Sequence, residues 1–240
     1  MMKRMSLLAF IVGGTILIGC VPAPFRSHPD LQSRAREIRS AAVLPPDVKI
    51  YEFSAGGVRD LRDDWCAAGK ANMIGAITSS FKEKLSEVRV VEVGKDIEEE
   101  IEDIYALYRA VSQSIILHTY NEKFRFPQKM KQFDYSLGPI GPLLDHFKTD
   151  GFVFVYGEDE ISTGGRKALQ AFAIVAGAIT GVMVIPRGGI TAVSVALVDK
   201  TGDILWYSVK AREGSYDLRK AESCTDFLGQ VLTDFPRFGQ

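Results

Sequence analysis

The side chains of this 240-residue chain that could do chemistry are few and scattered. Its cysteines and histidines are Cys20, Cys66, Cys224, His28, His118 and His146. None of them has the HExxH or paired-cysteine spacing of a zinc site. The chain also lacks a Gly-x-Ser-x-Gly elbow and the spacing of a Walker phosphate-binding loop. We therefore expect a protein that is not an enzyme and that holds no metal or cofactor.

The charged residues point to no ligand either. Asp63-Asp64 and Glu98–Glu100 fall where helices are expected to begin, and carboxylates there stabilise the helix dipole. Lys and Arg number 29 against 30 Asp and Glu, so the net charge is -1. The chain has no excess of basic residues, so its charge does not suggest nucleic-acid binding. The composition, 46% hydrophobic and 25% charged, is that of an ordinary globular domain.

The first residues have the pattern of an export signal. Lys3 and Arg4 precede the uncharged stretch Leu7–Ile18. As a helix this stretch is about 18 Å long, which is too short to cross a hydrocarbon layer of about 30 Å. The pattern predicts a signal peptide over residues 1–19. An ordinary secretory signal followed by an incidental cysteine is the alternative.

The sequence Leu17-Ile18-Gly19-Cys20 resembles the lipobox of bacterial lipoproteins. The resemblance implies cleavage after Gly19, thioether lipidation of Cys20 and acylation of the new amino terminus with fatty acids such as palmitate. Val21 follows the cysteine, and by resemblance to enteric lipoproteins this favours the periplasmic face of the outer membrane. We expect residues 20–29, with three prolines, to be an extended tether and residues 30–240 to form one periplasmic domain.

Cys66 and Cys224 remain after Cys20 is assigned to lipid. In an exported protein two such cysteines are candidates for a disulfide. Each lies on the apolar stripe of an expected helix, so the sulfurs meet if the helices lie side by side on one sheet face. Two buried free thiols are the alternative.

Apolar periodicity predicts an α+β fold, a small mixed β-sheet covered by helices, with a C-terminal β-hairpin and a closing helix. The Phe152–Tyr156 strand is apolar almost throughout, which is typical of a strand covered on both faces. Gly202 lies in the hairpin loop and is free to take a positive φ. The expected strands are 48–53, 88–93, 152–156, 190–198 and 204–209, and the expected helices are 30–42, 62–87, 96–119, 143–149 and 217–235.

The helix expected over 96–119 has an apolar seam with 4-3 spacing. The seam predicts a helix that lies on the sheet, and a coiled-coil contact with another subunit is the alternative.

An apolar insertion at about 165–189 separates two of the expected strands. Its stretch 168–186 is uncharged, and Ala173, Gly177 and Gly181 recur every fourth residue, a spacing that lets helices approach closely. Three hypotheses remain open for this segment. It packs in the chain's own core, it contacts another subunit, or it inserts into a membrane.

The order of elements resembles the periplasmic domain of the curli-secretion channel lipoprotein and of related small outer-membrane lipoproteins. The sequence pattern that is most similar to the family is that of the hairpin ITAVSVALVDKTGDILWYSV. The insertion departs from the channel-forming member, which has a membrane-crossing β-hairpin there, because it is helix-like and lacks alternating polarity. The resemblance implies an α+β fold and no catalytic residue.

We therefore expect a lipid-anchored binding or assembly component of an envelope or secretion complex, with protein partners or self-association. A stand-alone periplasmic ligand-binding or sensing module is the alternative.

Overall fold

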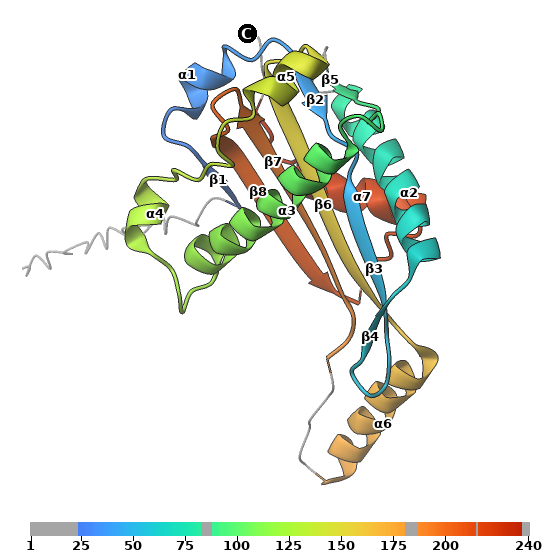
Figure 1. Ribbon diagram of the computed structural model, residues 1–240. Helices are drawn as coiled ribbons and strands as arrows, with labels where there is room; N and C mark the ends of the chain where they lie inside the picture. The colour runs from blue at the N-terminus through green and yellow to red at the C-terminus, as the bar shows by residue number, and fades with distance from the viewer. Residues whose placement is uncertain (1–23, 83–87, 181–186, 215, 237–240) are drawn as a thin grey trace, which may run out of the picture.

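A computed structural model describes residues 24–82, 88–180, 187–214 and 216–236. Within these ranges, eight strands form one mixed sheet with the order β1-β8-β7-β6, followed at the far edge of β6 by β2 with β5 and by β3 with β4. Figure 1 shows helices on both faces of this sheet. The α+β fold expected from the sequence is confirmed.

The strands are β1 (Phe25–Ser27), β2 (Ala41–Val43), β3 (Asp47–Phe53), β4 (Arg59–Leu61), β5 (Val88–Val90), β6 (Gly151–Ser162), β7 (Ile190–Asp199) and β8 (Ile204–Glu213). The helices are α1 (Leu31–Ala35), α2 (Asp63–Lys82), α3 (Glu98–Ile115), the π-helix η1 (Ile116–Tyr120), α4 (Pro127–Lys131), α5 (Gly141–Phe147), α6 (Gly164–Thr180) and α7 (Ala221–Val231).

Strand β6 is central and buried on both faces, as its sequence predicts. Phe152 and Phe154 point into the layer below α3, whereas Val153 and Val155 point into the layer below α2 and α7. Successive side chains of a strand face opposite sides, so a strand with helices on both sides must be apolar throughout.

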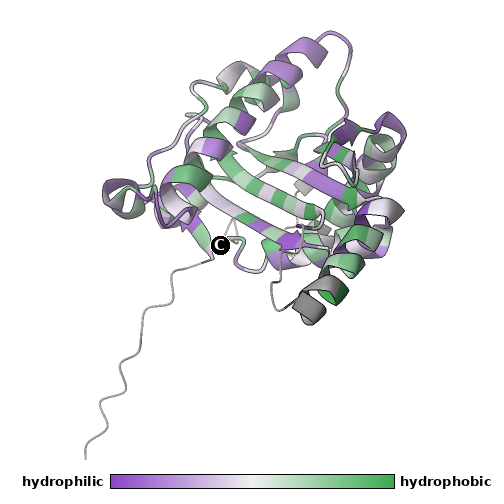
Figure 2. Ribbon diagram, turned by 90° about the horizontal axis from the view of Figure 1, so that it is seen from below, coloured by the Kyte–Doolittle hydropathy of each residue, from purple (hydrophilic) through white to green (hydrophobic). Residues whose placement is uncertain are grey.

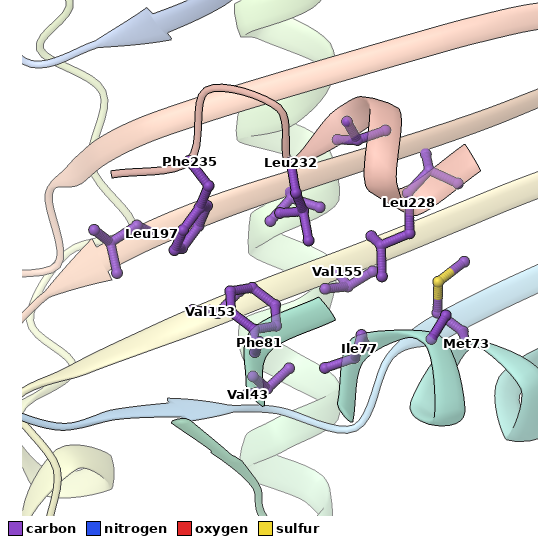
Figure 3. Packing of buried hydrophobic residues seen from close by; sticks show 14 of the residues in the cluster. Val43, Met73, Ile77, Phe81, Val153, Val155, Leu197, Leu228, Leu232 and Phe235 are labelled. Carbon is purple, nitrogen blue, oxygen red and sulfur yellow. The ribbon is translucent and has the colours of Figure 1, made fainter. Parts of the chain in front are cut away.

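The layer under α2 and α7 is a close-packed hydrophobic cluster (Figure 3). Met73, Ile77 and Phe81 extend from one stripe of α2, and all three are buried. The ring of Phe81 meets that of Phe235 edge-on at 5.0 Å between centroids. The apolar stripe predicted for this helix is therefore its core face.

The opposite layer is formed by α3, whose predicted apolar seam lies on the sheet. Ile101, Ile104, Tyr108 and Ile115 are buried, and the Tyr108 ring stacks on Phe154 with centroids 5.0 Å apart. In this structure the seam therefore packs against the chain's own sheet.

The boundary predicted between tether and domain is wrong. Phe25–Ser27, inside the expected tether 20–29, form β1 and pair with the edge of β8. Arg26 is buried and donates a hydrogen bond of 2.8 Å to the carbonyl oxygen of Thr119. The folded domain therefore begins before residue 30. This strand forms because the edge of β8 is open for pairing, and its three residues are too few to show a periodic pattern in the sequence.

The helix expected over 30–42 is also wrong in its second half. It ends after Ala35, and Ala41–Val43 enter a slot between β5 and β6 as the parallel strand β2. Ladder partners on both sides outweigh the weak local preference of this alanine-containing segment.

Candidate interaction site

Helix α6 leaves the body at one end of the sheet. It follows the end of β6 and precedes the start of β7, and the pairing of these strands extends to Asp159 and Thr191. Figure 1 shows α6 projecting past the ends of the strands, beside the loop that joins β3 to β4. The apolar insertion expected at about 165–189 thus contains an arm at the sheet's end.

The first turn of the arm is clamped to the body by Arg166, which is only 6% exposed. Its Nε donates to the carbonyl oxygen of Arg187 at 2.9 Å, and its terminal nitrogen donates to the carbonyl oxygen of Ser54 at 3.0 Å. Its guanidinium lies 3.7 Å from the centre of the buried Phe53 ring. A buried guanidinium whose donors are used in this way fixes the start of a helix.

The returning chain is clamped at the same place. Arg187 lies 4.6 Å from the centre of the Phe53 ring and forms an ion pair with buried Glu160. Glu160 also pairs with Arg59 of β4 at 2.9 Å. The hydrogen bonds to Glu160 raise the pKa of Arg187, so this guanidinium stays charged. The two ends of the insertion therefore meet on the Phe53 ring.

Beyond this clamp, between Ala168 and Val175, the arm exposes large apolar side chains. From Ala168 to Thr180 it contains no charged residue. Phe172, Ile174 and Val175 are 69%, 48% and 58% exposed, and Leu169 is also exposed. At 100° per residue these side chains point to different sides of the helix, not along one face. The hypothesis that this segment packs in the chain's own core is therefore wrong for the described residues.

Two of the three small residues noted in the sequence lie on α6. Ala173 is half-buried, and Gly177 follows one turn later. Gly181 lies outside the described residues, as does Cys20. The structure thus places Ala173 and Gly177 on the projecting arm and leaves the lipidation site untested.

The disulfide considered for Cys66 and Cys224 is not formed. Their helices, α2 and α7, lie side by side on one sheet face as that hypothesis required, yet both thiols are free. The Cys66 sulfur accepts a hydrogen bond from the N–H of Ile50 at 3.2 Å, and the Cys224 thiol donates to the carbonyl oxygen of Leu218 at 3.1 Å. Burial raises the pKa of Cys224 to about 12, which makes it an unreactive thiol.

A second exposed apolar region follows α3. Leu117 of η1 is 41% exposed, and Phe124 and Phe126 in the next loop are 56% and 52% exposed. The Phe126 ring stacks on the imidazole of His118 with centroids 4.3 Å apart. We call Leu117, Phe124 and Phe126 the η1 patch. Large apolar side chains grouped on a surface are typical of protein contacts.

A groove of about 700 Å³ lies between α2 and α3 at the edge of β3. Val48, Ile101 and Tyr105 give it apolar walls. Arg109 pairs with Asp47 across one side, and Lys49 lies 3.3 Å from the same carboxylate. Both charge signs line this groove, and neither a catalytic pair nor a metal-binding set is evident among its lining residues.

One buried carboxylate could not be recognised in the sequence. Asp159 of β6 is fully buried and accepts hydrogen bonds from the Thr191 hydroxyl at 2.7 Å and the Leu218 N–H at 2.8 Å. Burial raises its pKa to about 6 despite these bonds. Its partners tie β6 and β7 to the loop before α7, so its position indicates a structural role.

Neither metal chemistry nor a membrane span is indicated by the residues that the structure describes. Among them, His, Cys, Asp and Glu side chains do not gather in a group of three or more that could hold a metal ion. Their helices are all too short or too polar to cross a membrane. No protein-family model matches the chain, and no curated protein matches it in sequence.

Proposed function

We propose that this chain is a lipoprotein, anchored through Cys20 to the periplasmic face of the outer membrane, that works as a non-catalytic binding or assembly component of an envelope complex. The residues before Cys20 support the anchor, because a short apolar stretch after two cations and before a cysteine matches a lipoprotein signal. The resemblance to outer-membrane secretion lipoproteins in the order of elements supports the assembly role.

The observation that carries the proposal is the arm α6, which is fixed at its root and exposes Leu169, Phe172, Ile174 and Val175. Full burial of one large apolar side chain is worth about 1.5–3 kcal/mol. Phe172, Ile174 and Val175 leave much of that free energy unused in the isolated chain. Large apolar side chains grouped on a surface are typical of contact sites, so we take α6 as a binding element.

The η1 patch supports a second contact, with a protein. It belongs to the α3 layer, whereas α6 extends from the end of β6, so the two apolar regions can be occupied at the same time. An assembly component needs separate surfaces of this kind.

The anchor is tested by mass and by fractionation. We expect the amino-terminal peptide to begin at Cys20 and to carry the mass of a diacylglyceryl thioether and an amide-linked acyl chain. We expect globomycin to cause the precursor to accumulate. Cys20→Ser should release the protein from washed outer membranes. An unmodified Cys20 in the mature chain contradicts the proposal.

The assembly role is tested by size in a mild detergent. We expect the lipidated protein to sediment as a complex larger than a monomer. The double variant Leu117→Ser/Phe124→Ser should shift to the monomer. Val58→Ser is the matched control, because Val58 is 57% exposed on the loop between β3 and β4. A monomeric wild-type protein contradicts the role.

The groove between α2 and α3 favours a second candidate function, a stand-alone ligand-binding module. Its volume suits a small molecule, and it combines apolar walls with charged groups. A monomeric protein that carries a small molecule through purification, and loses it in the variant Arg109→Glu, favours this alternative.

A further inference from the structure

We infer that α6 lies in the surface of the same membrane that holds the lipid anchor, with its apolar side chains among the acyl chains of the facing leaflet. This inference rests on the proposed anchor at Cys20 and names the occupant of the arm. The register of the sheet, the length of chain between anchor and sheet, and the chemistry of the arm each support it.

The start of β1 points toward the end of the sheet that carries α6. β1 runs antiparallel to β8, with Phe25 opposite Ser208 and Ser27 opposite Trp206. Going backward from Phe25 therefore means going forward along β8, toward Glu213. Glu213 pairs with Ile190, the first residue of β7, at the end of the sheet from which the arm emerges.

The chain between the anchor and the sheet is short. Cys20 precedes Phe25 by five residues, which span at most about 18 Å. The five residues from Ser208 to Glu213 cover about 17 Å of strand. The acyl chains on Cys20 are therefore held close to the body, and within reach of the level at which α6 begins. The 17 residues of α6 extend about 26 Å from that level.

The arm has the chemistry of a helix that lies in a lipid surface. The uncharged stretch from Ala168 to Thr180 is about 20 Å long, shorter than the roughly 30 Å hydrocarbon layer. It is therefore too short for a span. Phe172, Ile174 and Val175 supply exposed apolar surface. A short apolar helix binds such a surface by burying its side chains at the boundary of headgroups and acyl chains.

Cations of α6 and β8 lie near the root of the arm. Lys167 and Arg212 are exposed there and Lys210 is half-buried, whereas Arg187 is paired with Glu160 and Glu213 accepts a hydrogen bond from the Gly188 N–H. Cations at the ends of lipid-inserted helices contact phosphate headgroups. Figure 2 views the molecule from this end and shows the hydrophobic colouring along α6. The exposed apolar side chains of α6 can contact acyl chains while the cations at its root contact headgroups.

The test uses the full-length lipidated protein in vesicles of phosphatidylethanolamine and phosphatidylglycerol. Phe172→Trp places a fluorescent reporter on the arm, and the emission of native Trp65 and Trp206 is subtracted with the wild-type protein. We expect the emission of this reporter to shift to the blue on reconstitution and to be quenched when the lipids carry brominated acyl chains. Phe124→Trp, on the η1 patch, is the matched control and should not be quenched, because Phe124 is similarly exposed but lies outside α6.

The outcomes separate the two proposals. An unquenched reporter in the Phe172→Trp variant, in vesicles whose protein carries acylated Cys20 by mass, overturns the lipid contact and leaves the anchor standing. Unmodified Cys20 overturns the anchor and this inference with it. A photo-cross-linking residue at position 172 that joins two copies of the chain, without quenching, overturns the lipid contact in favour of a second copy.

Discussion

The guanidinium of Arg166 lies 3.7 Å from the centre of the Phe53 ring, and through this contact the first turn of α6 is held against the end of β3. Two residues that are far apart in the sequence thus meet where the arm leaves the sheet. The contact is buried, whereas the arm beyond it is exposed. The direction of the arm is therefore set at its root.

Arg166→Ala should loosen the arm without unfolding the body. The change removes the cation–π contact and two hydrogen bonds, a loss of about 2–3 kcal/mol. Amide hydrogen exchange over residues 168–175 should speed up by about tenfold or more, because none of the α6 side chains described, up to Val175, belongs to either hydrophobic cluster. Lys167→Ala, at the exposed neighbouring position, should leave exchange unchanged. Equal protection in wild type and Arg166→Ala would show that the root is held by other contacts.

Asp159 should make the folded protein more stable in mild acid. Its folded pKa of about 6 lies above the ordinary value of 3.8, so the folded state binds more protons than the unfolded state between these values. The contribution of this group to the free energy of unfolding therefore falls by about 2 kcal/mol as the pH rises from 4 to 7.

Asp159→Asn should remove that pH dependence. The amide oxygen can still accept from Leu218, and the amide nitrogen can donate to the Thr191 hydroxyl. Urea unfolding of both proteins at pH 4, 5, 6 and 7 measures the difference, in which the other carboxylates cancel. A variant less stable than wild type at pH 7 would mean that the ionised group is favoured there.

Gly202→Ala should destabilise the hairpin strongly. Gly202 has φ of +85°, and a Cβ at this position would overlap the carbonyl oxygen of Gly138. The left-handed conformation costs about 1–2 kcal/mol and the overlap adds to it. Gly57→Ala is the matched control, because Gly57 has φ of +83° with open space around its Cα. The midpoints of urea unfolding should fall further for Gly202→Ala. Equal losses would show that φ alone sets the cost.

Both Cys66 and Cys224 should react as free thiols once the protein is unfolded without reductant. In the native protein Cys224 should resist iodoacetamide, because it is buried and its pKa is raised to about 12. Mass spectrometry after alkylation counts the modified sulfurs. Two unmodified cysteines in the unfolded, unreduced protein would show a disulfide, and the double variant Cys66→Ser/Cys224→Ser would then lose about 4–5 kcal/mol of stability.

Local sequence pattern was enough for most long elements. The stripe Met73, Ile77 and Phe81 predicted the core face of α2, and the run Phe152–Tyr156 predicted a doubly covered strand. Helical and strand periodicity follow from backbone geometry, so a long amphipathic segment indicates both its type and its buried side.

The short segments could not be predicted in this way. Phe25–Ser27 and Ala41–Val43 become strands because the edges of β8 and β6 offer ladder partners. Asp159 lies in the second half of β6, and nothing in its neighbours along the chain shows that Thr191 and Leu218 will meet it. The structure and contacts of such residues depend on partners that are distant in the sequence.

The sequence by itself determined the candidate export signal, the central strand and the apolar nature of residues 168–180. Only the tertiary structure decided that the described part of this stretch projects from the end of the sheet, and that Cys66 and Cys224 bond to separate backbone groups. The physical reason is that hydrophobicity is a property of each side chain, whereas exposure depends on which surfaces the whole chain brings together.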